Sequence, residues 1–496
     1  MSDGSSAEED DPELYLAAGR RMLAFSDVII AVWDGEKEVG IGGTGQIVRE
    51  AIARGLSIIW IHPDGNIYLI DDKEALDNKD GPNRYPIRLS EPLDIDNHLR
   101  VIRRIAPPDL ADRARERVLR FMTERTPERS WWSAYNLIRS IILKTPAKLS
   151  VTYTVDEDTE TAWGRYRAHA KTIGGERFSN ALQAKLETRW RHADAVSLHC
   201  SHAYRSTYVL NFVLAGFAVL FGLMSVFWWN AYEAVEIKGA FVLIEVILIL
   251  GIMTLTWLGR EDRNDWHIRW LEARAFAELM RSGRTLALIG QTASPPAEKV
   301  SPVDSSEWIE WLTRSTLREV PPPTGQLNAT ALSGAIESAL EDELAGQIDY
   351  NVSATKKYHD LDHALHHSGE LLFMITLAVG ASYVLFAIIY FLSSMSLDKS
   401  VTDPIKAVVT LLGAGLPAFG AALFGIKATG DFKVASEQAK RTLKKLESLR
   451  PELQKEKTAP NAAATLNLLN VLTSTLTTDL REWANIYELR ELTLPG

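Results

Sequence analysis

The chain has 496 residues, enough for about three domains of typical size, so a single compact enzyme domain is not expected. Lys and Arg number 54 against 64 Asp and Glu, and the net charge of -10 argues against nucleic-acid binding, which depends on neutralising phosphates. The one cysteine, Cys200, excludes an internal disulfide and a thiolate zinc site, and it is compatible with soluble parts in the cytoplasm.

The first 75 residues predict a disordered acidic tail followed by a small α/β unit. Residues 1–11 are acidic and polar and have little to bury. A short helix that starts at Pro12 is followed by the apolar run 28–33, which is typical of a buried parallel strand. A glycine-rich turn, a helix that ends at Gly55 and a second strand at 57–61 complete one βαβ unit.

The glycine-rich turn is the most informative local feature of the sequence. Ligands of open α/β sheets bind beyond the carboxyl ends of the strands, and bare backbone N–H groups at a helix N-terminus favour an anion. This pattern predicts a phosphate or nucleotide site, although such turns also occur only to pack a helix on its strand. The candidate ligand-binding residues are Asp34, Gly35, Gly42, Gly43, Thr44, Gly45 and Glu50.

The segments AAGRRMLAFSDVIIAVWDG and GIGGTGQIVREAIARGLSIIWI resemble the C-terminal half of the SLOG domain. This Rossmann-like superfamily includes LOG-type phosphoribohydrolases and sensors of nucleotide-derived signals in bacterial conflict systems. The resemblance covers residues 12–75 and implies that Gly42, Gly43 and Thr44 bind the phosphate or ribose of a nucleotide. It also matches Glu50 to the acidic residue of the LOG-type signature. The family's opening strand and first nucleotide-contacting loop would precede residue 12. We therefore expect either that the coding sequence starts further upstream or that this is a reduced domain with an incomplete ligand site, and catalysis is not expected.

Residues 76–155 are expected to connect the α/β unit to the rest of the chain. The stretch 64–128 predicts loops with one or two helices. Residues 129–148 combine Trp131 and Trp132 with isoleucines and basic residues, which is the composition of an amphipathic helix. Such a helix either lies in the plane of a bilayer surface or packs against another soluble helix.

Four segments are apolar and long enough to cross the ~30 Å hydrocarbon core of a bilayer as helices. Only Glu245 and Lys406 are charged within them, and they group as two hairpins. The expected fold class is therefore an α/β remnant with a partial Rossmann-like sheet, plus an all-α membrane protein with four transmembrane helices and long cytoplasmic helices. The four predicted spans are residues 209–229, 240–258, 371–392 and 405–426.

The orientation follows from the cations beside the spans, because Lys and Arg near span ends are retained in the cytoplasm. The segments that join the spans of each hairpin contain only Lys238 and Lys399, whereas many more cations flank the other ends. A multi-pass protein of the inner cell membrane with both termini in the cytoplasm is expected. The flanking cations are Arg189, Arg191, Arg205, Arg260, Arg263, Arg269, Arg274, Lys356, Lys357, Lys427, Lys433, Lys440, Arg441, Lys444 and Lys445.

The remaining segments predict two helical modules, 156–290 and 326–450, joined by a Pro-rich linker at 291–325 and followed by terminal helices at 451–496. A two-fold structural repeat is suspected. The stretches RYRAHA, ADAVSLHCSHAYRSTYVLNFVLAGFAVLFG and LPAFGAALFGIKATGDFKVASEQAKRTLKKLESL resemble SLATT-type membrane modules, which are proposed as membrane-perturbing effectors fused to sensor domains. This resemblance covers roughly residues 160–450.

Three further features of the sequence allow both a structural and a functional interpretation. Histidines at 359, 363, 366 and 367 can share a helix face, but histidines on a solvated polar face explain them equally well, so no metal is expected. Glu245 is expected to pair within the bundle or to reach the membrane surface. The small residues around Pro417 suit tight helix contact, with a moving hinge as the alternative.

The sequence thus favours a cytoplasm-facing sensor of a nucleotide-derived small molecule that acts on a four-span effector module, as in anti-phage signalling. The expected partners are the lipid bilayer, this small molecule and further copies of the chain; no nucleic acid and no cofactor are expected. Two alternatives stay open. One is a membrane-tethered LOG-like phosphoribohydrolase, and the other is a channel or transporter subunit.

Overall fold

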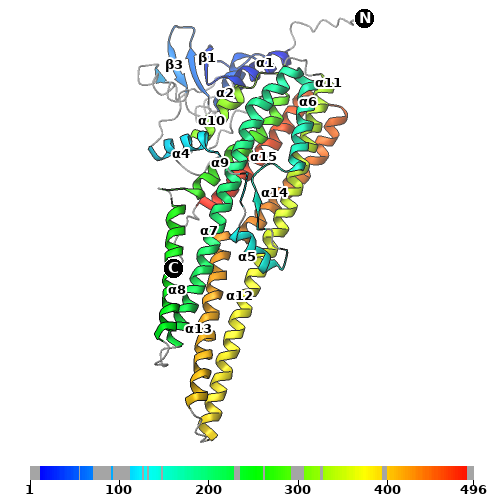
Figure 1. Cartoon of the computed structure of the whole chain (residues 1–496). Coiled ribbons are helices and arrows are strands. Elements are labelled where there is room, and N and C mark those ends of the chain that lie inside the picture. The colour runs from blue at the N-terminus through cyan, green and yellow to red at the C-terminus, as the bar shows by residue number, and fades with distance from the viewer. Residues whose placement is uncertain are drawn as a thin grey trace.

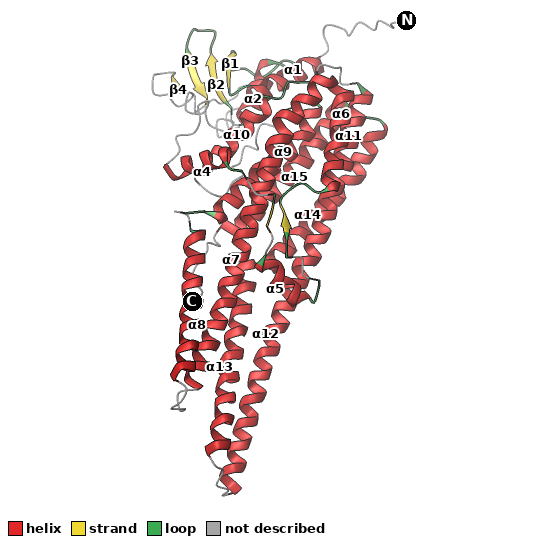
Figure 2. Cartoon of the chain, in the orientation of Figure 1, coloured by secondary structure: helices red, strands yellow, loops and turns green. Residues whose placement is uncertain are grey.

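A small α/β part lies at one end of a long helical part, and four long helices extend from the opposite end (Figure 1). Helices dominate the described residues, whose strands form one small sheet and a two-stranded ribbon (Figure 2). The acidic tail 1–11, Gly55, Trp131 and Trp132 lie outside the described residues. The computed structural model describes residues 12–54, 56–70, 91–92, 112–125, 128–130, 133–146, 149–227, 235–260, 263–291, 307–323, 328–393 and 399–488.

The α/β part consists of α1 (Pro12–Phe25), β1 (Val28–Val32), α2 (Thr44–Ala53), β2 (Ser57–Ile61), β3 (Ile67–Ile70) and β4 (Glu91–Pro92). The sheet order is β1-β2-β3-β4, with β1 and β2 parallel and the other pairs antiparallel. The predicted βαβ unit is confirmed, with Val28 opposite Ser57. The strand β3 was not expected. It returns along β2 after a turn in which His62 N–H donates to Asn66 and Gly65 has a φ of +91°.

The strand β1 is buried on one face only. Ile29 and Ala31 are each 5% exposed and belong to a small core with α1 and α2, whereas Ile30 and Val32 are 67% exposed. The prediction of a fully buried strand is therefore wrong. Successive side chains of a strand point to opposite faces, and α2 covers the face that carries Ile29 and Ala31.

The helical part is continuous around one hydrophobic core that takes residues from both predicted modules. Trp163, Phe276 and Trp308 are each at most 1% exposed within it. Its polar section consists of α4 (Asp112–Thr123), β5 (Arg129–Ser130), α5 (Ala134–Leu143), β6 (Val151–Thr152), α6 (Glu157–Leu182), the π-helical segment η2 (Gln183–Glu187), α9 (Trp266–Leu288), α10 (Glu307–Arg318), α11 (Ala329–Ser338), the π-helical segment η4 (Ala339–Leu344), α14 (Phe432–Thr458) and α15 (Ala462–Glu488).

The helix α6 folds back on itself at one glycine. Gly175 has a φ of +79°, which interrupts the helical backbone and is accessible to glycine at little cost. The two arms then contact each other, since Ser179 Oγ donates to the carbonyl of Arg167 at 3.0 Å. The bend also brings the ring of Trp163 to within 5.1 Å of the ring of Trp190, centroid to centroid.

The helix α10 lies where a linker was expected. Trp308 and Ile309 are 1% and 0% exposed, and the indole of Trp308 donates to Glu272 Oε1 at 3.2 Å. Its ring also lies 5.2 Å from that of Phe121. The predicted linker 291–325 therefore contains a packed helix. Its prolines lie on both sides of this helix in the sequence, at 295, 296 and 302 before it and at 321–323 after it. Residues 292–306 lie outside the described part.

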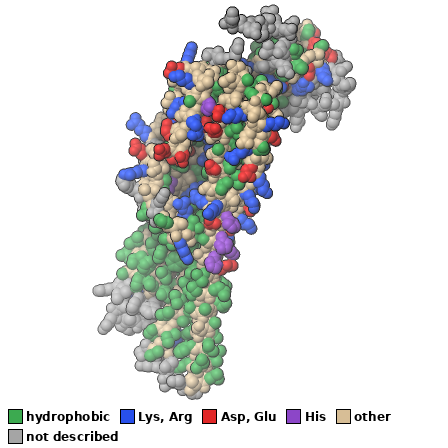
Figure 3. Space-filling model, turned by 90° about the vertical axis from the view of Figure 1, so that its right-hand side faces the viewer, with side chains coloured by type: hydrophobic (Ala, Val, Ile, Leu, Met, Phe, Trp, Pro, Cys, Tyr) green, Lys and Arg blue, Asp and Glu red, His purple; other side chains and the backbone are tan. Residues whose placement is uncertain are grey.

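Among the described residues, four helices are long and apolar enough to cross a membrane. They are α7 (Thr188–Phe227), α8 (Val235–Gly259), α12 (Ala345–Ser393) and α13 (Lys399–Gly430). The helix α7 packs against α8 and α13, and α13 packs against α12, so the order of neighbours is α8, α7, α13, α12. The apolar windows of these helices are mostly exposed, and Figure 3 shows their green side chains below the charged section. Such an all-apolar surface is suited to lipid.

Glycines and phenylalanines interlock where α7 meets α13. The ring of Phe212 on α7 lies over Gly425 of α13, and the ring of Phe419 on α13 lies over Gly216 of α7. A methyl group at Gly216 would lie 3.1 Å from the Phe419 ring. Each helix thus offers one large and one small residue to the other. Tight contact through the glycine-rich stretch of α13, one of the two interpretations of its sequence, agrees with this packing.

Two polar contacts join α7 to α8 inside the apolar section. Asn211 Nδ2 donates to Thr256 Oγ1 at 2.9 Å, and both residues are buried. Further along, the carboxylate of Glu245 lies against Gly222, whose missing side chain leaves the space that it occupies. Glu245 therefore packs between α8 and α7.

The order of elements repeats along the helical part. In each half a helix leads through a π-helical segment, η2 or η4, into a long helix that becomes apolar, α7 or α12. A second apolar helix follows, and then an aspartate with left-handed backbone precedes the next helix. These are Asp265 before α9 and Asp431 before α14, with φ of 46° and 42°. The order agrees with the suspected two-fold repeat.

Candidate functional site

The glycine loop between β1 and α2 surrounds an open cavity of about 670 Å³. Five of the seven candidate residues line it, namely Asp34, Gly42, Gly43, Thr44 and Gly45. The cavity lies beyond the carboxyl end of β1, the side where ligands of α/β sheets bind. Its other walls include Tyr15, Trp33, Glu36, Lys37, Glu38 and Pro63.

The other two predicted residues lie elsewhere. Gly35 has a φ of +81° and faces the Trp60 ring, so it shapes the turn without lining the cavity. Glu50 points to α1, where its carboxylate accepts from Arg20 Nε at 2.9 Å and Nη2 at 2.9 Å. Arg54 lies 3.7 Å from the same carboxylate. Burial, opposed by Glu50, lowers the pKa of Arg54 below its ordinary value.

A carboxylate of the protein already lies at the N-terminus of α2. Glu38 packs against Gly43 and Gly45, and its Oε2 would be 3.3 Å from a methyl group at Gly45. Its Oε1 is 2.6 Å from Arg49 Nη2. An anion is stabilised at this end of a helix, and Glu38 provides one. Neither Glu38, in the loop before α2, nor Arg49, within α2, was among the residues predicted from the sequence.

Several loop groups are occupied by contacts within the loop. Gly42 N–H donates to Gln46 Oε1 at 2.8 Å, and Gly43 N–H donates to the carbonyl of Gly40 at 3.2 Å. Asp34 Oδ1 accepts from Glu36 N–H at 3.0 Å. Gly42 has a φ of +82°, and a methyl group there would lie 2.7 Å from a backbone nitrogen of α1. Helix packing, the alternative interpretation of these glycines, therefore accounts for Gly42.

The α/β part is tied to the helical part through Asp27, the residue before β1. Its carboxylate forms an ion pair with Arg318 and lies 3.7 Å from Arg314, and both arginines belong to α10. Arg318 Nη2 also donates to the carbonyl of Ser26 at 3.0 Å. Since α10 packs on α9, a movement of β1 would be transmitted to the helical core.

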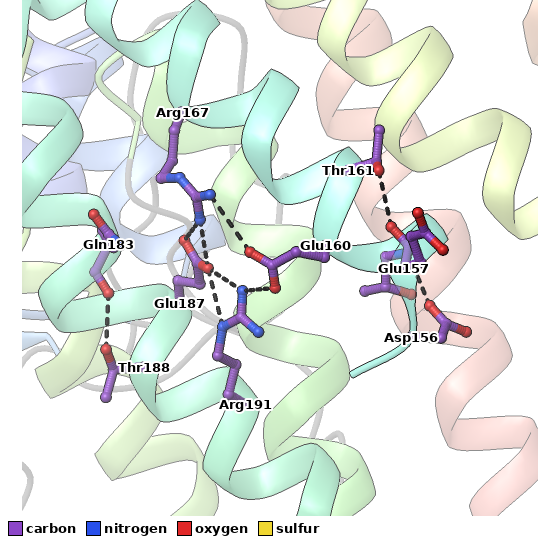
Figure 4. Close-up of polar contacts among 10 residues, drawn as sticks. Asp156, Glu157, Glu160, Thr161, Arg167, Gln183, Glu187, Thr188 and Arg191 are labelled. Carbon is purple, nitrogen blue, oxygen red and sulfur yellow. Dashed lines mark hydrogen bonds and ion pairs between the residues drawn. The ribbon is translucent and has the colours of Figure 1, made fainter. Parts of the chain in front are cut away.

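A second polar cluster surrounds the π-helical segment η2 (Figure 4). Glu187 is 2% exposed, and its carboxylate accepts from Arg167 Nη1 at 2.6 and 2.7 Å and from Arg191 Nε at 3.0 Å. Glu160 adds an ion pair with Arg191 at 2.6 Å. Partial burial alone would lower the pKa of Arg191, but hydrogen bonds to Glu187 and Glu160 raise it.

The segment η4 holds buried carboxylates in the same way. Asp342 is 7% exposed and accepts from Arg165 Nε at 2.8 Å, and Glu343 is 2% exposed and lies 3.1 Å from both Arg281 and Arg284. π-Helical segments are frequent at functional positions. Charged residues at helical spacing look like a solvated face in the sequence, so no signal identified either cluster.

The histidines considered for a metal are not gathered into a site. The rings of His363 and His367 stack 6.4 Å apart, and His366 forms an ion-pair contact with Glu370 at 3.3 Å. The described residues contain no group of three or more His, Cys, Asp or Glu side chains placed to hold a metal ion. His202 lies on another helix, α7, and burial lowers the pKa of its imidazole to about 4.

Comparison of the chain with protein-family models, with curated proteins and with solved structures finds no match. The resemblances to SLOG and SLATT modules therefore stay predictions from the sequence. The geometry itself defines an open cavity at the carboxyl end of the first strand of a βαβ unit. Ion pairs join this α/β part to a helical part with four apolar helices.

Proposed function

We propose that this protein is a multi-pass membrane protein whose α/β part binds a small nucleotide-like anion in the cytoplasm and transmits binding to four membrane-spanning helices. The observation that carries this proposal is the Glu38 carboxylate at the N-terminus of α2, beside a cavity of about 670 Å³. Glu38 occupies the place where a ligand phosphate is favoured, and Arg49 is its cationic partner.

The membrane assignment rests on four helices of suitable length and composition. We propose that α7 with α8 and α12 with α13 cross the inner cell membrane as two hairpins, with both chain termini in the cytoplasm. The excess of Lys and Arg beside the polar ends of these helices supports this orientation. A protease-protection experiment tests it: cleavage of either terminus from the outer face of intact cells would contradict it.

In the proposed mechanism the ligand anion displaces Glu38 from Arg49 and from the start of α2. Glu38 is 13% exposed and Arg49 is 38% exposed, so the pair is worth only about 1 kcal/mol and a phosphate can replace it. Displacement would free the loop that carries Glu38 and change the packing of β1. The ion pairs of Asp27 with α10 then offer the route to the helical core. A ligand drives such a change only through unequal affinity for the two arrangements.

The LOG-like hydrolase is less well supported. Glu50, the acid that this alternative would use, is engaged by Arg20 and Arg54 and does not line the cavity. We therefore favour binding over catalysis. We also propose that the protein assembles with further copies of itself and serves as an effector in anti-phage signalling, in keeping with the sequence resemblances.

Calorimetric titration of the detergent-solubilised chain with a panel of nucleotides tests ligand binding. Glu38→Gln should bind about fivefold more tightly, because the competing pair of about 1 kcal/mol is lost, whereas Arg49→Gln should bind more weakly. Glu36→Gln is the control for a change of charge in the same cavity. Gly43→Trp should abolish binding. The opposite signs are diagnostic, since a purely structural pair would give the same change for both of its members.

The proposal fails if wild type and Gly43→Trp are indistinguishable over the whole panel. It also fails if Glu38→Gln and Arg49→Gln change affinity in the same direction, because Glu38 would then not be a substitute for the ligand. Circular dichroism of each variant shows whether the α/β part is still folded.

A further inference from the structure

Three cations from three helices come together around the tyrosines of α5 and α12. The guanidinium carbons of Arg139 on α5 and Arg205 on α7 lie 6.0 and 5.7 Å from the centroid of the same ring, that of Tyr135. Lys357 on α12 lies 5.8 Å from the ring of Tyr358. The helix α5 packs against both α7 and α12, which is why cations distant in the sequence meet here.

These cations have aromatic neighbours and, in the part of the chain that the structure describes, lack carboxylate partners. Arg205 also stacks on Trp270, at 5.0 Å from the ring centroid. Within the described residues, none of Arg139, Arg205 and Lys357 forms an ion pair or donates a hydrogen bond. Burial, together with the charges of Arg205 and Arg139, lowers the pKa of Lys357 to about 8. Partly buried cations without a counter-charge are costly, so a bound anion would stabilise all three.

A hydroxyl group in the same cluster also lacks a partner. Tyr135 is 7% exposed, and its phenolic oxygen is buried without a hydrogen bond in the described part of the chain. A buried donor of this kind costs about 1–3 kcal/mol unless it is satisfied. Tyr358, whose ring Lys357 approaches, also lines a small cavity of about 50 Å³ between α9, α12, α14 and α15.

The cluster lies at the boundary between the polar and apolar sections. Within α7, Arg205 lies one turn before the apolar run that starts at Val209. The helix α5 lies beside α7 and α12 at this level in Figure 1, and Figure 3 shows blue side chains next to the green section. In the proposed orientation this is the depth of the lipid headgroups on the inner face.

We propose that Arg139, Arg205, Lys357 and the hydroxyl of Tyr135 form a binding site for a phosphate monoester, separate from the glycine loop. Arginine supplies forked donors that match phosphate oxygens, lysine supplies a point charge, and the phenol supplies one more donor. A phosphate monoester carries close to two negative charges and three acceptor oxygens. It can therefore interact with all three cations, whereas a carboxylate has one charge and two oxygens. The group belongs either to phosphatidic acid of the membrane or to a soluble phosphate compound.

Thermal unfolding in lipid nanodiscs tests this site and its source. One arm compares nanodiscs of phosphatidylcholine with and without phosphatidic acid, and the other adds inorganic phosphate to phosphatidylcholine nanodiscs. Stabilisation in the first arm only assigns the lipid, and stabilisation in the second assigns a soluble ligand. Lys357→Gln and Tyr135→Phe should each raise the ligand concentration needed for half of the maximal stabilisation about tenfold. Lys356→Gln, at an exposed neighbouring residue, should match wild type.

Tyr135→Phe separates binding from folding. Without ligand this variant should be at least as stable as wild type, because it removes an unpaired buried hydroxyl and keeps the ring. The inference is overturned if neither phosphatidic acid nor phosphate stabilises wild type. It is also overturned if Lys357→Gln and Arg139→Gln both respond as wild type does.

Discussion

Replacing Gly425 by alanine should destabilise the contact between α7 and α13. A methyl group at this position would lie closer than 3.0 Å to three atoms of the Phe212 ring, so the ring or the helix must move. Overpacking of this kind costs about 1–3 kcal/mol. Alanine also gains about 0.5–1 kcal/mol over glycine in a helix, which hides part of the cost.

Gly420→Ala provides the matched control. Gly420 lies in the same helix, and a methyl group there would meet nothing within 4 Å. The gain in helix propensity is common to both variants, so the difference between them isolates the overlap with Phe212. We expect Gly425→Ala to be less stable than Gly420→Ala by about 1–3 kcal/mol, and Phe212→Leu in the Gly425→Ala background should recover part of this.

Unfolding in detergent micelles, followed by circular dichroism, measures the difference. The reasoning is refuted if Gly425→Ala is as stable as Gly420→Ala, since α13 would then not face α7 through Gly425. A loss of stability that Phe212→Leu does not reduce would place the overlap on a different neighbour.

Three more predictions concern the polar section. Glu187→Leu should lower the free energy of unfolding by about 3–5 kcal/mol, because Arg167 then keeps only Glu160 as an ion-pair partner. Glu176→Gln, at an exposed residue, should change this free energy by under about 0.5 kcal/mol. Chemical denaturation measures both variants. Trp308→Ala should cost about 3–5 kcal/mol by opening a cavity, and an unchanged denaturation midpoint would mean that α10 is a linker after all. Burial raises the pKa of Asp194 above its ordinary value of 3.8, so the folded state holds this proton more tightly and stability falls as pH rises from about 4 through the raised pKa. Asp194→Asn should remove that fall and raise the melting temperature at pH 7; equal pH profiles of the two proteins would contradict it.

Local patterns in the sequence were enough to predict the βαβ unit and the four long apolar helices. The strands at 28–33 and 57–61 are apolar runs between turn residues, and the apolar windows are too long for most soluble helices. Which face of β1 is covered depends on where α2 packs, and this is a tertiary property. Ile30 and Val32 look as buried as Ile29 in the sequence and are nevertheless exposed.

The candidate site was predicted only in part, for a similar reason. The glycines indicated a loop between β1 and α2, and five of the seven predicted residues line one cavity there. The contact of Glu38 with Arg49 joins two segments whose proximity the spacing does not reveal. Glu50 matched a motif by position, but its carboxylate is directed by Arg20 on another helix. The sequence shows which types of side chain lie near the loop. The direction in which each of these side chains points depends on partners that are distant in the sequence.

The unbroken length of α12 has a mechanical consequence. Its 49 residues form one rod of roughly 70 Å that begins directly after η4 and continues to the far tip of the apolar section. A stiff rod amplifies rotation: a tilt of about 5° at its polar end displaces the other end by about 6 Å, which is more than one helical turn. Very small rearrangements beside the carboxylates of η4 would therefore displace the far end of α12 by more than the height of one helical turn.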